Sequence, residues 1–155
     1  MKPTQIFPDL ALSFLGTDHK TLADISPKNF TLLVVYRGLH CPICKTYLET
    51  LNNMAADLKE RGVEIVVTSS DNEKDALETQ KNWAVDQLTF TYGLREDQAR
   101  SIDLYLTKRD PQDPTKTVLY AEPGLFLLKP DLTLFFSSIQ TMPFLRPDIR
   151  NLVSN

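Results

Sequence analysis

Residues 30–44 read FTLLVVYRGLHCPIC, an apolar and β-branched run that leads into two cysteines. An uninterrupted run of this kind is typical of a strand covered on both faces, as in a parallel sheet. From residue 44 to residue 58, apolar side chains recur at three- and four-residue spacing, which predicts a helix with one apolar stripe. Residues 63–68 repeat the pattern of a buried strand. The segment 30–68 therefore predicts one βαβ unit with a crossover helix.

The rest of the chain predicts shorter elements around this unit. We expect strands at residues 11–15, 89–92, 124–129 and 133–137, and helices from residue 73 to about 85, at 95–104 and at 147–153. The acidic residues at 71–73 are expected to cap the first of these helices on a solvated face. Residues 108–116 are polar with two Asp-Pro steps, which predicts a surface loop. This order of elements predicts one α/β domain, residues 1–155, with a mixed sheet.

Composition excludes several classes of protein. The chain has 155 residues, a net charge of -3 and a pI of about 5.4, whereas a general nucleic-acid binder is usually basic. No apolar run approaches the roughly 18 residues of a transmembrane helix, and residues 1–8 lack the apolar core of a secretory signal. We therefore expect a cytoplasmic protein that binds neither nucleic acid nor membrane. Its two cysteines do not form the framework of a secreted protein.

Cys41 is the residue that the sequence singles out for chemistry. It falls where a buried strand meets a helix N-terminus, and the unpaired N–H groups and dipole there favour a thiolate, which predicts a lowered pKa. Arg37 and His40 would strengthen this effect if their side chains turn inward, and Pro42 suits the first helical position. Cys44 lies one turn further on, where its thiol can attack a mixed disulfide or a sulfenic acid at Cys41. We expect Cys41 to be the nucleophile and Cys44 the resolving thiol.

Two other interpretations of the cysteine pair stay open. The thiols can be buried small hydrophobic side chains, or they can bind a metal. A structural zinc site needs four ligands, and Cys41, Cys44 and His40 supply at most three, with His19 in a different loop. We expect no metal and no cofactor. A Cys-x-x-Cys pair at the start of the helix in a βαβ unit favours redox chemistry instead.

The chain resembles the peroxiredoxin-like branch of the thioredoxin superfamily, the AhpC/TSA group, over nearly its whole length. The residues that carry the resemblance are 16–18, 35–44, 62–63 leading into 67–71, 122–126 and 138–147. The resemblance implies a thioredoxin-like fold, in which helices flank a mixed central β-sheet and an N-terminal strand extends it. The Cys-Pro-x-Cys pair is similar to the active sites of thioredoxins and glutaredoxins.

Pro123, just before an apolar strand, has two interpretations. It can simply mark the start of that strand. Thioredoxin-fold oxidoreductases, however, place a cis-proline opposite the cysteine pair, and this resemblance implies that Pro123 has a cis peptide bond and shapes the substrate groove. Ordinary thioredoxins also carry a buried acid six residues before the first cysteine and a tryptophan directly before it. Those positions hold Val35 and His40 here.

The chain departs from typical peroxiredoxins at the positions that form the hydroperoxide pocket. Gly38 stands where they have threonine or serine, Val34 where they have proline, and Pro123 where they have an arginine. Arg37 and Arg146 are the candidates to replace that arginine. The pocket of a standard peroxidase is therefore missing from the sequence.

These residues predict an enzyme, a thiol-dependent oxidoreductase acting in disulfide exchange or antioxidant defence. One alternative is a thiol-dependent peroxidase that reduces hydroperoxides, and another is a non-catalytic thioredoxin-fold module that binds a metal or a partner protein. The expected substrates are a protein or small-molecule disulfide, or a hydroperoxide. An external thiol such as thioredoxin or glutathione would be the reductant. Peroxiredoxin-like proteins often dimerise, so the resemblance also allows a homodimer.

Overall fold

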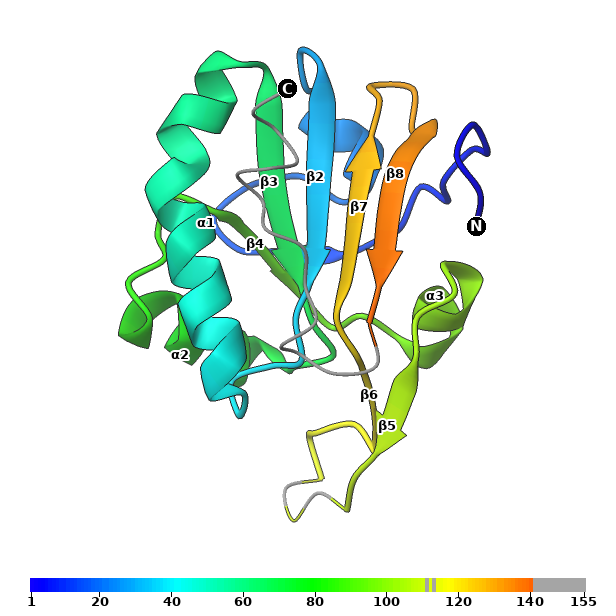
Figure 1. Ribbon diagram of the computed structural model, residues 1–155. Helices are drawn as coiled ribbons and strands as arrows, with labels where there is room; N and C mark the ends of the chain where they lie inside the picture. Colours follow the sequence, from blue (N-terminus) through cyan, green and yellow to red (C-terminus); the bar gives the residue numbers. More distant parts are fainter. Residues whose placement is uncertain (111, 113, 141–155) are drawn as a thin grey trace.

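The computed structural model describes residues 1–110, 112 and 114–140, in which a mixed sheet carries helices on both faces (Figure 1). The strands of this sheet follow the order β1-β4-β3-β2-β7-β8. Their bounds are β1 Ser13–Phe14, β2 Phe30–Val35, β3 Val63–Thr68, β4 Thr89–Tyr92, β7 Gly124–Leu128 and β8 Leu134–Ile139. The helices are η1 Leu22–Ile25, α1 Pro42–Glu60, α2 Glu73–Asn82 and α3 Glu96–Ser101. The predicted fold class is confirmed.

The predicted βαβ unit forms the centre of the molecule. β2 pairs with β3 in parallel, from Phe30 opposite Val63 to Val35 opposite Thr68, and α1 makes the crossover. Side chains of β2 alternate between the two faces: Leu32 packs with the α1 stripe, and Leu33 packs on the other face with Phe126. Both faces of β2 are therefore covered, which explains why its sequence is apolar without interruption.

Helix ends follow backbone conformation rather than apolar periodicity. Gly62 adopts a φ of 78° directly after α1 and ends it as predicted. α2 ends at Asn82, three residues before Val85, because Ala84 has a φ of 52° and turns the chain back toward the core. α3 ends at Ser101, and Asp103 has a φ of 64°. The predicted closing helix at 147–153 lies outside the described residues.

A second, two-stranded sheet was not predicted. β5 Leu106–Lys108 pairs antiparallel with β6 Leu119–Ala121, and the polar loop predicted at 108–116 connects them. Each strand has three residues, which is too short to show an alternating pattern. This hairpin, β5–β6, projects beyond the end of the main sheet at which β2 and β3 terminate (Figure 1). It therefore stands at the same end of the molecule as the two cysteines.

Among the described residues, no helix is both long enough and apolar enough to cross a membrane.

Candidate active site

Cys41 and Cys44 lie at the N-terminus of α1, at the end of the loop that follows β2. Cys41 is the N-cap residue of α1, and Pro42 is its first helical residue, as predicted. The Cys41 sulfur accepts the Cys44 N–H at 3.4 Å, and the Cys44 sulfur accepts the Arg37 N–H at 3.5 Å. Neither cysteine forms a disulfide, and 2% of Cys41 and 0% of Cys44 are exposed. Both sulfurs are therefore buried, and each accepts a hydrogen bond from a backbone N–H group.

The loop before Cys41 requires a glycine at position 38. Gly38 has a φ of 132°, and a Cβ atom there would lie 2.5 Å from an Asp71 carboxylate oxygen. The same carboxylate accepts the Leu39 N–H at 2.9 Å, while the Gly38 carbonyl accepts the Cys41 N–H at 3.1 Å. Asp71 thus holds the backbone that presents Cys41. A threonine or serine at position 38, as in typical peroxiredoxins, would clash with this carboxylate.

Asp71 does not lie where the sequence predicts it, in the solvated cap of α2. It is not part of a solvated cap, because only 3% of it is exposed, and Asn72 caps α2 in its place. Burial raises the pKa of Asp71 to about 6. The Leu39 hydrogen bond opposes this shift, Asp75 adds to it, and Arg109 opposes it. Below about pH 6 the carboxyl beneath the Cys41 loop is therefore protonated.

Replacing Asp71 with asparagine should stabilise the protein at neutral pH. The folded-state pKa lies above the ordinary aspartate value of 3.8, so the native state binds this proton more tightly than the unfolded state does. The gain in the free energy of unfolding should be about 2–3 kcal/mol at pH 7.5, shrink as pH falls through 6, and vanish below about pH 4. Asparagine still offers an oxygen to the Leu39 N–H.

Urea titrations from pH 4 to 8 measure this effect. Asp18→Asn, at an exposed position, is the matched control and should not stabilise the protein at pH 7.5. A destabilised Asp71→Asn at pH 7.5 would contradict the assignment of Asp71 as a costly buried carboxylate.

Arg37 reaches from the Cys41 loop to the segment before β7. Its Nε lies 3.1 Å from a carboxylate oxygen of Glu122, and its Nη2 donates to the Tyr120 hydroxyl. Glu122 is buried and also accepts the Thr107 hydroxyl at 2.6 Å. Burial lowers the pKa of Arg37, but Glu122, Tyr120 and Cys41 together raise it above its ordinary value. Arg37 is therefore a permanent cation close to Cys41, and sequence reasoning missed its partner Glu122.

His40 does not supply the positive charge expected of it. Its ring meets the edge of Tyr120, with 5.0 Å between centroids. Partial desolvation of the ring lowers the pKa of His40 to about 4, and the neighbouring cations Arg109 and Arg37 lower it further in the same direction. His40 is therefore neutral near pH 7, so that Arg37 alone of the two predicted cations carries charge there.

Pro123 stands at the entry to β7, but its peptide bond is trans, so the expected cis bond is wrong. Only Glu122 and Pro123 separate β6 from β7, and the chain continues in extended form between them. Gly124 then pairs with Val35 at the end of β2, which places Pro123 near the start of the Cys41 loop. Arg146, the other candidate for a peroxidase arginine, lies outside the described residues.

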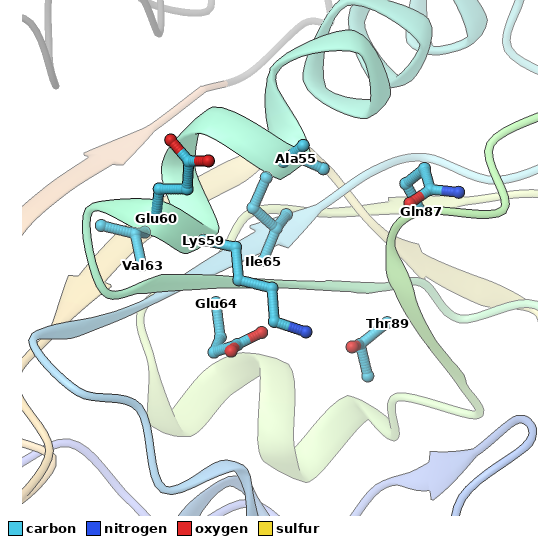
Figure 2. A pocket seen from close by; sticks show the side chains of 9 residues that line it. Ala55, Lys59, Glu60, Val63, Glu64, Ile65, Gln87 and Thr89 are labelled. Carbon is cyan, nitrogen blue, oxygen red and sulfur yellow. The ribbon is translucent and has the colours of Figure 1, made fainter.

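A surface pocket on α1 is not part of this site. It lies at the far end of the helix, between α1, β3 and β4, with Lys59, Glu60 and Glu64 among its lining residues (Figure 2). Lys59 is 18 residues from Cys41, or about 27 Å along a helix. The described residues also contain no group of three or more His, Cys, Asp or Glu side chains that could hold a metal ion.

Two buried thiols at the first turn of the crossover helix of a thioredoxin-like fold define a class of protein, the thiol-dependent oxidoreductases. The model of the AhpC/TSA family matches residues 3–136, and the chain therefore belongs to the AhpC/TSA family. It is an enzyme of thiol redox chemistry. Comparison with the curated proteins gave no match.

Solved structures share the fold at low sequence identity. A cysteine-to-serine mutant of peroxiredoxin 6 from Arenicola marina aligns with a TM-score of 0.79 and 16% identity, over 98% of this chain and 70% of that one. A reduced peroxiredoxin from Vibrio vulnificus in complex with hydrogen peroxide gives 0.76 and 12%, over 96% and 92%. A putative thiol:disulfide interchange protein DsbE from Chlorobium tepidum gives 0.69 and 17%, over 90% and 86%. At these identities the likeness concerns the fold alone.

Proposed function

We propose that the protein is a thiol–disulfide oxidoreductase in which Cys41 is the nucleophile and Cys44 the resolving thiol. The observation that carries the proposal is the contact between them, in which the Cys41 sulfur accepts the Cys44 N–H at the first turn of α1. Unpaired N–H groups and the helix dipole favour a thiolate at this position. Arg37 adds a permanent positive charge nearby.

The reaction proceeds by two exchanges. The Cys41 thiolate attacks one sulfur of a protein or small-molecule disulfide, the substrate S–S bond breaks, and the other substrate sulfur leaves as a thiolate. The thiolate released in this first exchange takes the proton of Cys44. Cys44 then attacks the Cys41 sulfur, which releases the second substrate sulfur as a thiolate. The substrate has gained two electrons, and the enzyme holds a Cys41–Cys44 disulfide. An external thiol such as thioredoxin or glutathione reduces that disulfide in a reducing compartment such as the cytoplasm.

Hydroperoxide reduction is the second candidate, which membership of the AhpC/TSA family and the proximity of Arg37 to Cys41 favour. In that reaction Cys41 would displace water or an alcohol from the peroxide and become a sulfenic acid, which Cys44 would resolve. The guanidinium of Arg37, however, is already engaged by Glu122 and Tyr120. Gly38 also brings no hydroxyl to the site. The engaged guanidinium of Arg37 and the lack of a hydroxyl at position 38 both support a disulfide, rather than a hydroperoxide, as the substrate.

The rate at which the reduced protein loses thiols distinguishes the two candidates. Hydrogen peroxide should oxidise Cys41 no faster than a free thiol of similar pKa, whereas bis(2-hydroxyethyl) disulfide should oxidise both cysteines faster than it oxidises that free thiol. Stopped-flow thiol loss and intact mass provide the measurement, with Cys41→Ser as the blank. Rapid reaction with hydrogen peroxide that ends in a Cys41–Cys44 disulfide would establish a peroxidase instead.

A further inference from the structure

The β5–β6 hairpin places cations beside the Cys41 loop. Tyr120 of β6 contacts the ring of His40, the residue directly before Cys41. The guanidinium carbons of Arg37 and Arg109 each lie 5.2 Å from the centroid of the Tyr120 ring. Arg37 comes from the loop after β2, and Arg109 comes from the loop of the hairpin. Tyr120 therefore holds two guanidinium groups from distant segments next to the reactive cysteine.

Two of the cations in this region are paired with carboxylates, and one is not. Arg37 pairs with Glu122, and Lys116 Nζ lies 3.2 Å from an oxygen of Asp75. Arg109 donates from Nε to the Thr117 carbonyl at 2.9 Å and from Nη2 to the Thr117 hydroxyl at 3.4 Å. Among the described residues, no carboxylate forms an ion pair with Arg109. Its charge is therefore available to an anion that approaches the cysteine.

The positive field of these cations reaches His40, the residue directly before Cys41. Arg109, Arg37 and Lys116 all lower the pKa of His40, and Asp75 is the carboxylate that opposes them. The whole chain carries a net charge of -3, so this positive region runs against the charge of the molecule. A locally positive field attracts an anionic ligand even where the net charge of the chain is negative.

We propose that Arg109 binds a carboxylate on the small thiol or disulfide that exchanges with Cys41. A guanidinium matches a carboxylate with two parallel N–H···O bonds. The inference rests on the proposed thiol–disulfide exchange at Cys41 and names the class of substrate for it. Anionic disulfides should then react faster than neutral ones, and neutral ones faster than cationic ones.

Alkylation of the reduced protein tests the charge preference without any turnover. The Cys41 thiolate displaces iodide from iodoacetate, which is anionic, or from iodoacetamide, which is neutral, and a new S–C bond forms in both cases. Both reagents consume the same thiolate, so the ratio of the two rates cancels a change in the pKa or the orientation of Cys41. Peptide mapping by mass spectrometry assigns the alkylated residue.

Arg109→Gln should lower the iodoacetate-to-iodoacetamide ratio roughly fivefold, and about 0.5 M salt should lower the ratio of the unmodified protein in the same direction. Lys129→Gln removes an equal charge from an exposed position directly after β7, at the end of that strand away from the Cys41 loop, and should leave the ratio unchanged. Equal ratios in Arg109→Gln and the unmodified protein overturn the inference.

Turnover of three small disulfides separates this inference from the proposed function. The probes are dithiodiglycolate, bis(2-hydroxyethyl) disulfide and cystamine, which are anionic, neutral and cationic. Turnover of all three at similar rates would overturn the charge selection and leave the exchange reaction standing. A strong preference for iodoacetate that depends on Arg109, with no turnover of any disulfide, would support the anion site and overturn the proposed function.

Discussion

Cys41→Ser should abolish disulfide reduction, with a loss of about a thousandfold or more in kcat/KM. A serine hydroxyl is not ionised near neutral pH, and no other described side chain at the start of α1 offers a nucleophile except the Cys44 thiol, which is fully buried. The measurement is the rate of bis(2-hydroxyethyl) disulfide reduction with an excess of external thiol. Activity near that of the unmodified protein would refute the role of Cys41.

Serine is the suitable replacement because the fold should tolerate it. Cys41 is the N-cap of α1, and its side chain accepts the Cys44 N–H. Serine is among the preferred N-cap residues, and its oxygen can accept the same N–H. The midpoint of thermal unfolding should therefore stay close to that of the unmodified protein, and a loss of activity then reports on chemistry rather than on folding.

Cys44→Ser should trap the substrate on the enzyme and reduce turnover of a protein disulfide by about a hundredfold. The first exchange needs only Cys41, so a mixed disulfide forms. Its release depends on an intramolecular thiol with a high effective concentration, which serine removes. Intact mass without reductant should show one covalently bound substrate per chain, located at Cys41.

The double variant Cys41→Ser/Cys44→Ser is the control for this trap and should bind no substrate covalently. A Cys44→Ser enzyme that turns over at the normal rate and accumulates no adduct would show that an external thiol resolves Cys41. Cys44 would then be a buried structural residue, held by the Arg37 N–H.

The central unit of the fold could be predicted because its sequence pattern is local. β2 is buried on both faces, and every residue from Leu32 to Val35 is fully buried, so that the apolar run alone indicates it. α1 shows its stripe over about four turns and has a proline at its start and a glycine after its end. The β5–β6 hairpin gives no such signal, because Tyr120 and Ala121 are buried by packing against the rest of the chain rather than by a repeating pattern.

Only part of the candidate site could be predicted, because a sequence pattern indicates only residues that are close together along the chain. The cysteines and Arg37 lie within one short stretch, and their proximity follows from the turn between β2 and α1. Asp71 and Glu122 are distant in sequence, and nothing in their neighbourhood marks them as buried partners of the Cys41 loop. The lowered pKa of His40 follows first from its burial and then from Arg109, and no periodicity could give either.

The near-complete burial of the two sulfurs has a consequence for what the enzyme can accept. A small molecule needs only a brief opening to touch Cys41, whereas a folded protein must wait until a larger part of the loop moves aside. The apparent rate for a bulky substrate is then the intrinsic rate multiplied by the fraction of molecules that are open. We therefore expect small disulfides to react with Cys41 faster than the disulfides of folded proteins do.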